Sequence, residues 1–307
     1  MRVAVTGATG VLGRALVDAL LARGDEVVAL SRDADRARQA LGDRVEAHAW
    51  PIPSDAPPPE DALAGADAVV NLLGEPVAQR WSTEAKDRIR DSRVAGTHSL
   101  VQGLLALVPD RRPRTLVSQS ASGYYGPHGD EPLTEDAPAG SDFLAGVVVA
   151  WEREALVAAS DLRVALTRTG VVLSPDGGAL AKMLPFFRLG IGGPVAGGRQ
   201  YVPWVHLDDV LGVLLFSLDN PQASGPINLA APDPVSNADF SRALGRVLTR
   251  PAVLPVPAFA LRLLYGDMAE IVTTGQRLVP ARLEQLGYQF RQPKLEPALR
   301  DVLKRSS

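Results

Sequence analysis

The sequence predicts an α/β fold in which a doubly wound parallel sheet carries a smaller C-terminal lobe. Short apolar runs alternate with stretches of helical spacing as far as about residue 173, which is the order of βαβ units. After residue 173 the chain becomes glycine-rich and is punctuated by prolines, a change typical of a second, smaller lobe. We therefore expect a sheet domain over residues 1–173, completed by later segments around 201–230, and a substrate-side lobe over residues 174–307.

Apolar alternation and helical spacing place the elements along the chain. Strands are expected at residues 3–5, 26–30, 67–72, 115–118 and 164–166. Helices are expected at residues 12–22, 86–107, 143–159, 238–248 and 259–265, followed by a short final helix. The proline-rich stretch 51–59 is expected to be an exposed connection within the sheet domain.

The composition excludes several classes of function. The 307 residues carry a formal charge of −3, which gives no net attraction to nucleic acid or anionic lipid. Cysteine is absent, so disulfides, thiolate catalysis and cysteine metal sites are excluded, and the four histidines are scattered. No apolar run approaches the ~18 residues that span a membrane, and no signal-peptide pattern is found. We expect a cytoplasmic protein with no metal, nucleic-acid or membrane partner.

A glycine-rich turn follows the first expected strand and opens the first expected helix. At this junction Gly7 permits a tight turn, Gly10 lets backbone amides approach a pyrophosphate, and Gly13 allows close packing of helix on strand. The alternative is a tight βα turn that binds nothing. The turn predicts a Rossmann-type dinucleotide site with contacts at Thr6, Gly7, Thr9, Gly10, Val11, Leu12 and Gly13.

The end of the second expected strand indicates which dinucleotide is bound. An acidic residue at this point would bind both ribose hydroxyls of NAD(H), but the chain has Ser31 and Arg32. A guanidinium beside a hydroxyl suits a 2′-phosphate, so we predict NADP(H) in preference to NAD(H). Arg32 could instead be an exposed residue of the charged segment 32–38, and the neighbouring Asp33 complicates the assignment.

The G-x-x-G-x-x-G spacing and a series of later motifs resemble the extended short-chain dehydrogenase/reductases. More closely, they are similar to an atypical, epimerase-like family within the NAD-dependent epimerase/dehydratase superfamily, which has its own C-terminal domain. The matching motifs are Asn71–Pro76, Arg80–Trp81, Ser92–Arg93, Ser120–Gly126, Phe143–Ala145, Trp151–Glu152, Arg168–Gly170, Phe187–Pro194, Gln200 and Trp204–Asp209. The resemblance implies that residues from about 237 to 307 are the family's extension.

The resemblance also implies further cofactor contacts. Small residues after the strand that ends near Asn71 would leave room for the adenosine, while a helix carrying Ser92 would approach the nicotinamide half. The asparagine usual in relatives is replaced here by Arg93. The implied contacts are Asn71, Leu72, Leu73, Gly74, Ser92, Arg168 and Gly170.

The family's usual catalytic pair is missing. Short-chain reductases use a tyrosine and, four residues later, a lysine, but Leu144 and Val148 occupy those places and cannot transfer a proton. The remaining candidates are the hydroxyls of Ser120 and Ser122 and the phenols of Tyr124 and Tyr125. Alternatively, both tyrosines only pack the turn before Gly126, with their hydroxyls hydrogen-bonded.

Two further regions have a functional and a structural interpretation. Lys182, Arg188 and Gln200 lie where relatives face the substrate and could hold an anionic ligand, although the cations could equally be solvated. The segment His206–Asp209 permits a metal hypothesis, but its place in the family favours capping at a strand–helix junction. Residues 268–274 and 278–280 could form a lid or a partner surface.

We expect an NADPH-dependent oxidoreductase that acts on an unidentified small molecule, and an oligomer is possible. A second hypothesis, favoured by the missing pair, is a non-catalytic NADP(H)-binding redox sensor or scaffold. A nucleotide-sugar epimerase is a weaker hypothesis, because epimerisation through a keto intermediate must move a proton twice.

Overall fold

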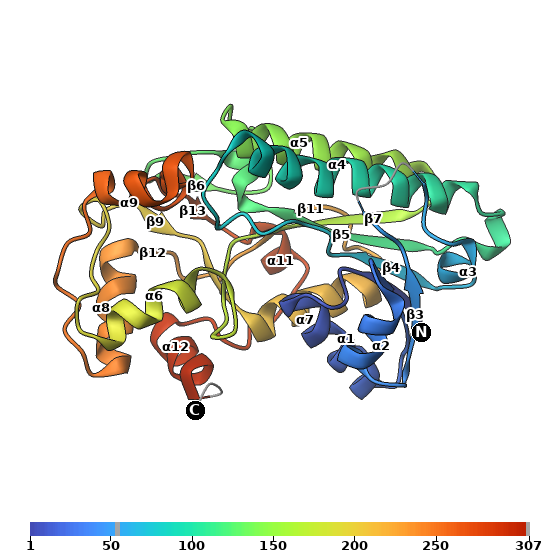
Figure 1. Ribbon diagram of the computed structural model, residues 1–307, viewed down its shortest axis with the longest axis horizontal. Helices are drawn as coiled ribbons and strands as arrows, with labels where there is room; N and C mark the ends of the chain where they lie inside the picture. The colour runs from blue at the N-terminus through green and yellow to red at the C-terminus, as the bar shows by residue number, and fades with distance from the viewer. Residues whose placement is uncertain (53–55, 305–307) are drawn as a thin grey trace.

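The computed structural model describes residues 1–52 and 56–304, and its centre is a seven-stranded sheet (Figure 1). The strand order is β11-β7-β5-β4-β1-β2-β3, and every neighbouring pair is parallel. The strands are β1 (Arg2–Thr6), β2 (Glu26–Ser31), β3 (Val45–Ala49), β4 (Ala68–Asn71), β5 (Thr115–Ala121), β7 (Arg163–Thr169) and β11 (Gly225–Leu229). The predicted Rossmann-type α/β fold is confirmed.

Helices cover both faces of the sheet, as Figure 1 shows. One face carries α1 (Val11–Arg23), α2 (Ala34–Leu41) and α7 (Leu207–Asp219). The other carries α3 (Glu60–Leu63), α4 (Thr83–Ala106) and α5 (Phe143–Leu156). Because side chains alternate along a strand, Val3 and Val5 pack into the core with α1 and α7, whereas Ala4 packs into the core with α4. Burial on both faces explains why the central residues of β1, β2 and β4 are apolar.

Local sequence explains where the long helices begin. The Asp142 carboxylate accepts the amides of Leu144 and Ala145 at the start of α5, and Ser82 accepts the amide of Ala85 at the start of α4. Both caps satisfy amides that have no partner within the helix.

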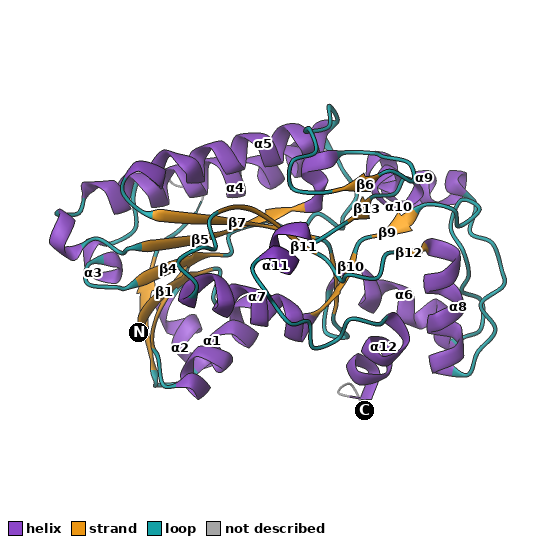
Figure 2. Cartoon of the chain, turned by 180° about the vertical axis from the view of Figure 1, so that it is seen from behind, coloured by secondary structure: helices purple, strands orange, loops and turns teal. Residues whose placement is uncertain are grey.

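The C-terminal lobe packs beside the carboxyl ends of the strands (Figure 2). Its core lies between α6 (Gly178–Arg188), α8 (Asn237–Leu248) and α12 (Leu295–Lys304). Two small ladders support it: β8 (Val171–Leu173) with β10 (Trp204–His206), and β9 (Tyr201–Val202) with β12 (Val235–Ser236). The remaining elements are β6 (Pro132–Leu133), α9 (Ala258–Tyr265), α10 (Ala269–Thr273), β13 (Arg277–Leu278) and α11 (Ala281–Gln285).

The chain enters the lobe and then returns to the sheet. After α6 and β10 it runs back through α7 and adds β11 beside β7. Strand β3 was not among the expected strands, and β5 extends three residues beyond the expected end because Gln119 to Ala121 pair with β7. In the proline-rich stretch, Pro51 and Pro57 are exposed, Pro58 is buried, and residues 53–55 lie outside the described residues. Within the described residues, no helix has the length and apolar character needed to cross a membrane.

Candidate functional site

The candidate site lies at the carboxyl ends of the parallel strands, where the strand order reverses between β1 and β4. Chain connections leave these two neighbouring strands in opposite directions, to α1 on one face and towards α4 on the other. Such a reversal opens a crevice above the sheet, which is the place where α/β proteins bind ligands.

Gly7 and Gly13 let the turn after β1 pack closely, because neither residue has a side chain. Gly7 has a φ of 64°, and a Cβ built on it would lie 2.6 Å from the Leu72 carbonyl oxygen. A Cβ on Gly13 would lie 2.2 Å from the Gly7 carbonyl oxygen. Both contacts are with backbone, so a side chain at either position could not be accommodated by a rotamer change. The turn therefore packs directly against the end of β4.

The N-terminus of α1 has the features of an anion site. Its first residue follows Gly10, which offers no side-chain cap, and the first turn contains no acidic residue. The amides of Val11 and Leu12 therefore lack the capping oxygen found at α4 and α5, and the helix dipole adds positive potential there. Gly177 lies across this turn, since a Cβ on it would be 3.2 Å from Val11 Cγ2. The geometry suits a phosphate bound by backbone amides.

At the end of β2, the carboxylate next to Arg32 already accepts a hydrogen bond. Asp33 caps α2 by accepting the amide of Arg36 at 3.0 Å. The side chain of Arg32 is exposed and has no hydrogen bond or ion pair within the described part of the chain. Ser31, at the strand end, is partly buried. An unpaired guanidinium therefore faces solvent beside the crevice.

The side chains of Thr6 and Asn71 serve the frame of the site. Thr6 donates its hydroxyl to Asn71 Oδ1 at 2.8 Å and accepts the amide of Leu72. Asn71 Nδ2 donates to Thr97 at 2.9 Å and to Ser118 at 3.1 Å. These buried bonds tie β1, β4, β5 and α4 together. The polar side chains of Thr6 and Asn71 therefore already have partners within the protein, and the backbone at Leu72 and Gly74 is less buried.

The Ser92 hydroxyl also makes its hydrogen bonds within the protein. Its hydroxyl donates to the Ile89 carbonyl at 3.2 Å and accepts the amide of Glu75 at 2.9 Å. The residue thereby fixes the segment after β4 against α4. Ser92 positions the wall of the crevice, and its hydroxyl has no second hydrogen to offer a cofactor.

A buried ion pair joins α5 to the sheet. Arg168 donates from Nε to Glu152 Oε1 at 2.8 Å and from Nη2 to Glu152 Oε2 at 2.9 Å. Burial opposes the charge, but the bonds to Glu152 outweigh it and raise the pKa of Arg168. The guanidinium of Arg168, which is only 4% exposed, is held in the ion pair with Glu152, an arrangement that favours a structural role over the predicted cofactor contact.

Ser120 belongs to the same cluster. Its hydroxyl donates to Glu152 Oε1 at 2.6 Å, and the residue is 1% exposed. A serine hydroxyl has one hydrogen, so while that hydrogen is held by the Glu152 carboxylate it cannot be donated to a substrate carbonyl. The structure thus differs from the expected orienting role of Ser120.

Tyr125 cannot act as the missing acid, because it is fully buried. Its phenol donates to Asn228 Oδ1 at 2.6 Å and accepts from Arg168 Nη1 at 2.9 Å. Burial raises the pKa of Tyr125 to about 12, despite the nearby guanidinium. The burial and hydrogen bonds of Tyr125 favour the packing alternative over a catalytic role.

Two hydroxyls remain available at the end of β5. Ser122 and Tyr124 are partly exposed, and within the described residues neither hydroxyl has a hydrogen-bond partner. The Tyr124 ring packs against the Arg168 guanidinium, 3.4 Å from its centroid to Cζ. Leu144 and Val148 lie against the same turn, 3.5 and 3.8 Å from a Cβ built on Gly123. The helix face that usually carries the tyrosine and lysine is therefore apolar.

The expected substrate residues have separate surroundings. Lys182 donates to the Ala78 carbonyl, and Gln200 Nε2 donates to the carbonyls of Val195 and Val272, each at 3.0 Å. Arg188 is exposed at the end of α6. The structure brings Lys182 to the segment after β4, whereas Gln200 is held within the lobe.

The expected cofactor contact Gly170 must lack a side chain, since a Cβ there would lie 2.0 Å from the Pro203 carbonyl oxygen.

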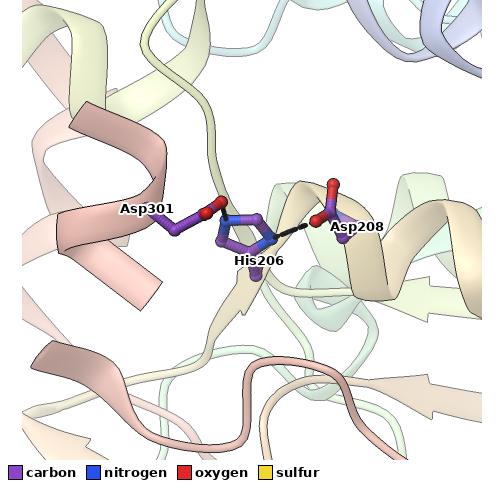
Figure 3. Close-up of side chains that lie close together, drawn as sticks. All are labelled: His206, Asp208 and Asp301. Carbon is purple, nitrogen blue, oxygen red and sulfur yellow. Dashed lines mark hydrogen bonds and ion pairs between the residues drawn. The ribbon is translucent and has the colours of Figure 1, made fainter. Parts of the chain in front are cut away.

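His206 lies at the junction of β10, α7 and α12 (Figure 3). Its Nδ1 accepts the amide of Asp208 at 3.0 Å, and its Nε2 lies 3.2 Å from Asp301 Oδ2. The three side chains bring possible ligand atoms within 4.8 Å of one another. However, the two carboxylates lie on opposite sides of the ring, and Nδ1 already caps α7. The arrangement suits a structural junction better than a metal site.

The sequence argument missed three residues of this region. Glu152 was named only within the motif Trp151–Glu152, yet it binds Ser120 and Arg168. Asn228, on β11, holds Tyr125 and donates to the Leu133 and Val279 carbonyls, each at 3.0 Å. Arg93 appeared only as a departure from the family. A signal existed for Glu152, since it lies four residues after Val148 and therefore on the same face of the expected helix.

Comparison with known proteins agrees with this geometry. Residues 3–230 match the model of the NAD dependent epimerase/dehydratase family, and residues 256–302 match a domain of unknown function. A chloroplastic epimerase family protein SDR39U1 homolog from Arabidopsis thaliana is 41% identical over 99% of this chain and 87% of its own length. Human epimerase family protein SDR39U1 is 34% identical over 99% of this chain and 100% of its own length.

Solved structures give the same result. Human SDR39U1 crystallised with NADPH superposes with a TM-score of 0.87, 32% identity and 99% coverage of both chains. A nucleoside-diphosphate sugar epimerase from Corynebacterium glutamicum has a TM-score of 0.76 and 34% identity, covering 98% of this chain and 58% of the other. A UDP-glucuronic acid 4-epimerase from Bacillus cereus, at 18% identity and a TM-score of 0.78, shares the fold.

Proposed function

Because the chain belongs to the NAD-dependent epimerase/dehydratase family, as its motifs predict, we propose that it binds NADP(H) and acts as an atypical short-chain oxidoreductase on a small molecule. The human relative was crystallised with NADPH, which supports the choice of cofactor. The observation that carries the proposal is that two positively charged features lie at the crevice: the N-terminus of α1, which has no side-chain cap, and the exposed guanidinium of Arg32.

The residues present fit a dinucleotide in three places. The amides of Val11 and Leu12 would hold the pyrophosphate, and the absence of a Cβ at Gly10 leaves room for it. Arg32 would bind the 2′-phosphate, since Asp33 is engaged as a cap and cannot compete for it. The backbone from Leu72 to Gly74 would line the nucleoside.

When bound, the nicotinamide supplies or accepts a hydride, and the protein must handle the accompanying proton. Among the described residues, the Ser122 hydroxyl and the Tyr124 phenol are the candidate hydroxyls after β5 that make no hydrogen bond. We assign to them the hydrogen bond to a substrate carbonyl. Glu152 and Arg168 hold the strand end and the turn beneath them.

The test is reduction of a panel of carbonyl compounds by NADPH, followed as loss of nicotinamide absorbance. Ser122→Ala and Tyr124→Phe should lower the rate by about 100-fold or more if they assist proton transfer. Ser160→Ala, at an exposed serine far along the chain, is a matched control that should leave the rate unchanged. A rate that survives both site substitutions would refute the assignment.

A second candidate is a non-catalytic NADP(H) sensor or scaffold, favoured by the apolar face that Leu144 and Val148 present to the turn. A sensor must bind NADPH and NADP⁺ with different consequences for a partner. Tight NADPH binding with no turnover on the panel, together with partner affinity that depends on cofactor state, would support it. Equal partner affinity with oxidised, reduced and absent cofactor would eliminate it.

A nucleotide-sugar epimerase is less well supported, although one relative is named as such. Epimerisation needs a group that removes and returns a proton, and no tyrosine or lysine stands on the helix face that usually provides it.

The absence of cysteine fits a reducing compartment, and we propose the cytoplasm. Fractionation of cells that express the tagged protein would test that location.

A further inference from the structure

Arg93 is a partly buried cation on α4, beside the end of β4. Its guanidinium lies over the Trp151 ring, 5.3 Å from the ring centroid. Its Nη1 donates to the Glu75 carbonyl at 3.0 Å and to the Ile89 carbonyl at 3.1 Å. These contacts hold the side chain in one place, with the plane of the guanidinium fixed against α5.

The other nitrogens of Arg93 have no partner. Within the described residues neither Nη2 nor Nε makes a hydrogen bond, and no carboxylate forms an ion pair with the guanidinium. The nearby Glu75 carboxylate instead accepts from Gln79 and lies 3.8 Å from Arg88 Nε. Arg93 is thus a fixed cation without a counter-charge.

Other buried arginines of this protein are satisfied differently. Arg163 uses both terminal nitrogens, donating to the carbonyls of Ser217, Ala223 and Leu218 and to the Thr115 hydroxyl. Arg168 has the Glu152 carboxylate. An Nε without a hydrogen-bond partner also occurs at Arg112, Arg277 and Arg282, so the feature that sets Arg93 apart is the position of its Nη2 beside Gly74, next to the proposed nucleotide site.

The Nη2 of Arg93 lies against Gly74, just after the end of β4. A Cβ built on Gly74 would lie 2.8 Å from Nη2, so only the absence of a side chain there leaves the nitrogen uncovered. Gly74 follows Leu72 by two residues, and the Leu72 carbonyl packs directly on Gly7 of the phosphate-binding turn. The free donors therefore lie next to the proposed nucleotide site.

Burial of an uncompensated cation costs free energy. Consistent with that cost, burial lowers the pKa of Arg93 to about 10, even though the field of Glu75 opposes the shift. An anion that accepted hydrogen bonds from Nη2 and Nε would remove the imbalance, and the planar fork of a guanidinium suits the paired oxygens of a phosphate or carboxylate.

We propose that Arg93 is an anion-binding residue of the crevice, whose Nη2 and Nε bind two oxygens of a phosphate or carboxylate group. The anion would come either from the cofactor pyrophosphate or from an acidic substrate. The inference rests on the proposed function for the location of the crevice, while the free donors of Arg93 stand independently of it.

The test uses the full chain and isothermal titration calorimetry. Arg93→Gln removes the charge but keeps an amide that can donate to the Glu75 carbonyl. Arg88→Gln is the matched control, because Arg88 is an exposed arginine five residues earlier on the same helix. Each protein is titrated with NADPH, and with inorganic phosphate and oxalate both in the cofactor-free form and after saturation with NADPH.

Loss of the charged hydrogen bonds should lower the affinity for the ligand that accepts them by about 10- to 100-fold. Weaker NADPH binding in Arg93→Gln identifies the cofactor as the source of the anion. A second outcome is that Arg93→Gln binds NADPH as the wild type does, but no longer binds the oxalate or phosphate that the NADPH-saturated wild type binds. That outcome identifies the substrate as the source of the anion. The proposal is overturned if Arg93→Gln changes the affinity for none of these ligands.

Two further readouts keep the result interpretable. Arg93→Lys keeps the charge without the fork, so it should recover part of the lost affinity, and thermal unfolding monitors whether either variant folds. If the wild type fails to bind NADPH, the proposed function falls. The phosphate and oxalate titrations of the cofactor-free protein still decide the role of Arg93.

Discussion

The buried pair of Glu152 and Arg168 supports a strong prediction about stability. Glu152 is 6% exposed and accepts hydrogen bonds from Arg168 Nε, Arg168 Nη2 and Ser120 Oγ. The change Glu152→Gln keeps the volume, removes the negative charge and replaces one acceptor oxygen with a donor. A donor then faces the Arg168 guanidinium, which stays charged and buried without a counter-ion.

The cost follows from that unpaired charge. Removing one partner of a buried ion pair destabilises a protein by about 3–5 kcal/mol, since the remaining ion is neither hydrated nor paired. An exposed pair gives a matched comparison. Glu46 lies 2.8 Å from Arg2, and its side chain is 50% exposed. Glu46→Gln should therefore cost only about 0–1 kcal/mol.

Urea unfolding followed by far-ultraviolet circular dichroism measures both variants against the wild type. We expect Glu152→Gln to lower the free energy of unfolding by about 3–5 kcal/mol with little change in slope. A loss below about 1 kcal/mol, equal to that of Glu46→Gln, would refute the interpretation of the pair as buried and structurally essential.

Three further changes test other parts of the account. Gly13→Ala should abolish NADPH binding in calorimetry, because its Cβ would meet the Gly7 carbonyl at 2.2 Å; retained affinity would contradict the packed turn. Burial raises the pKa of Tyr125 to about 12, so its stabilising contribution is complete below the unfolded pKa near 10 and is lost as the pH rises towards 12. In Tyr125→Phe the free energy of unfolding should therefore fall less between pH 10 and pH 12 than it does in the wild type, as measured by unfolding at several pH values. Asp209→Ala should expose the chain at Arg291 and Gln292, whose amides Asp209 accepts at 2.7 and 3.0 Å, to limited proteolysis.

The fold and the glycine turn were predictable because their signals are local. Strand, glycines and helix follow one another within residues 3–22, and each glycine has a steric reason that holds wherever such a turn is built. Strand β11 is different, since it pairs with β7 about 60 residues earlier in the sequence. No local pattern states which strand a short apolar run will join.

The hydrogen-bond partners of the candidate catalytic side chains could not be predicted from the sequence. Ser120 stands where the family places a reactive hydroxyl, but its hydrogen is bound by Glu152, a residue 32 positions later. Tyr125 is likewise bound by Asn228, 103 positions later. Such commitments depend on the packing of α5 and β11 onto the sheet, and they determine which hydroxyls remain free.

The assignment of NADP(H) depends most directly on Arg32, so the decisive measurement is the affinity of the wild type and of Arg32→Ala for NADPH and NADH. We predict that the wild type prefers NADPH by about 10- to 100-fold, the effect of charged hydrogen bonds to one phosphate. The variant should lose that preference while binding NADH unchanged. Equal affinity of the wild type for both cofactors, or a preference that survives in Arg32→Ala, would contradict the account.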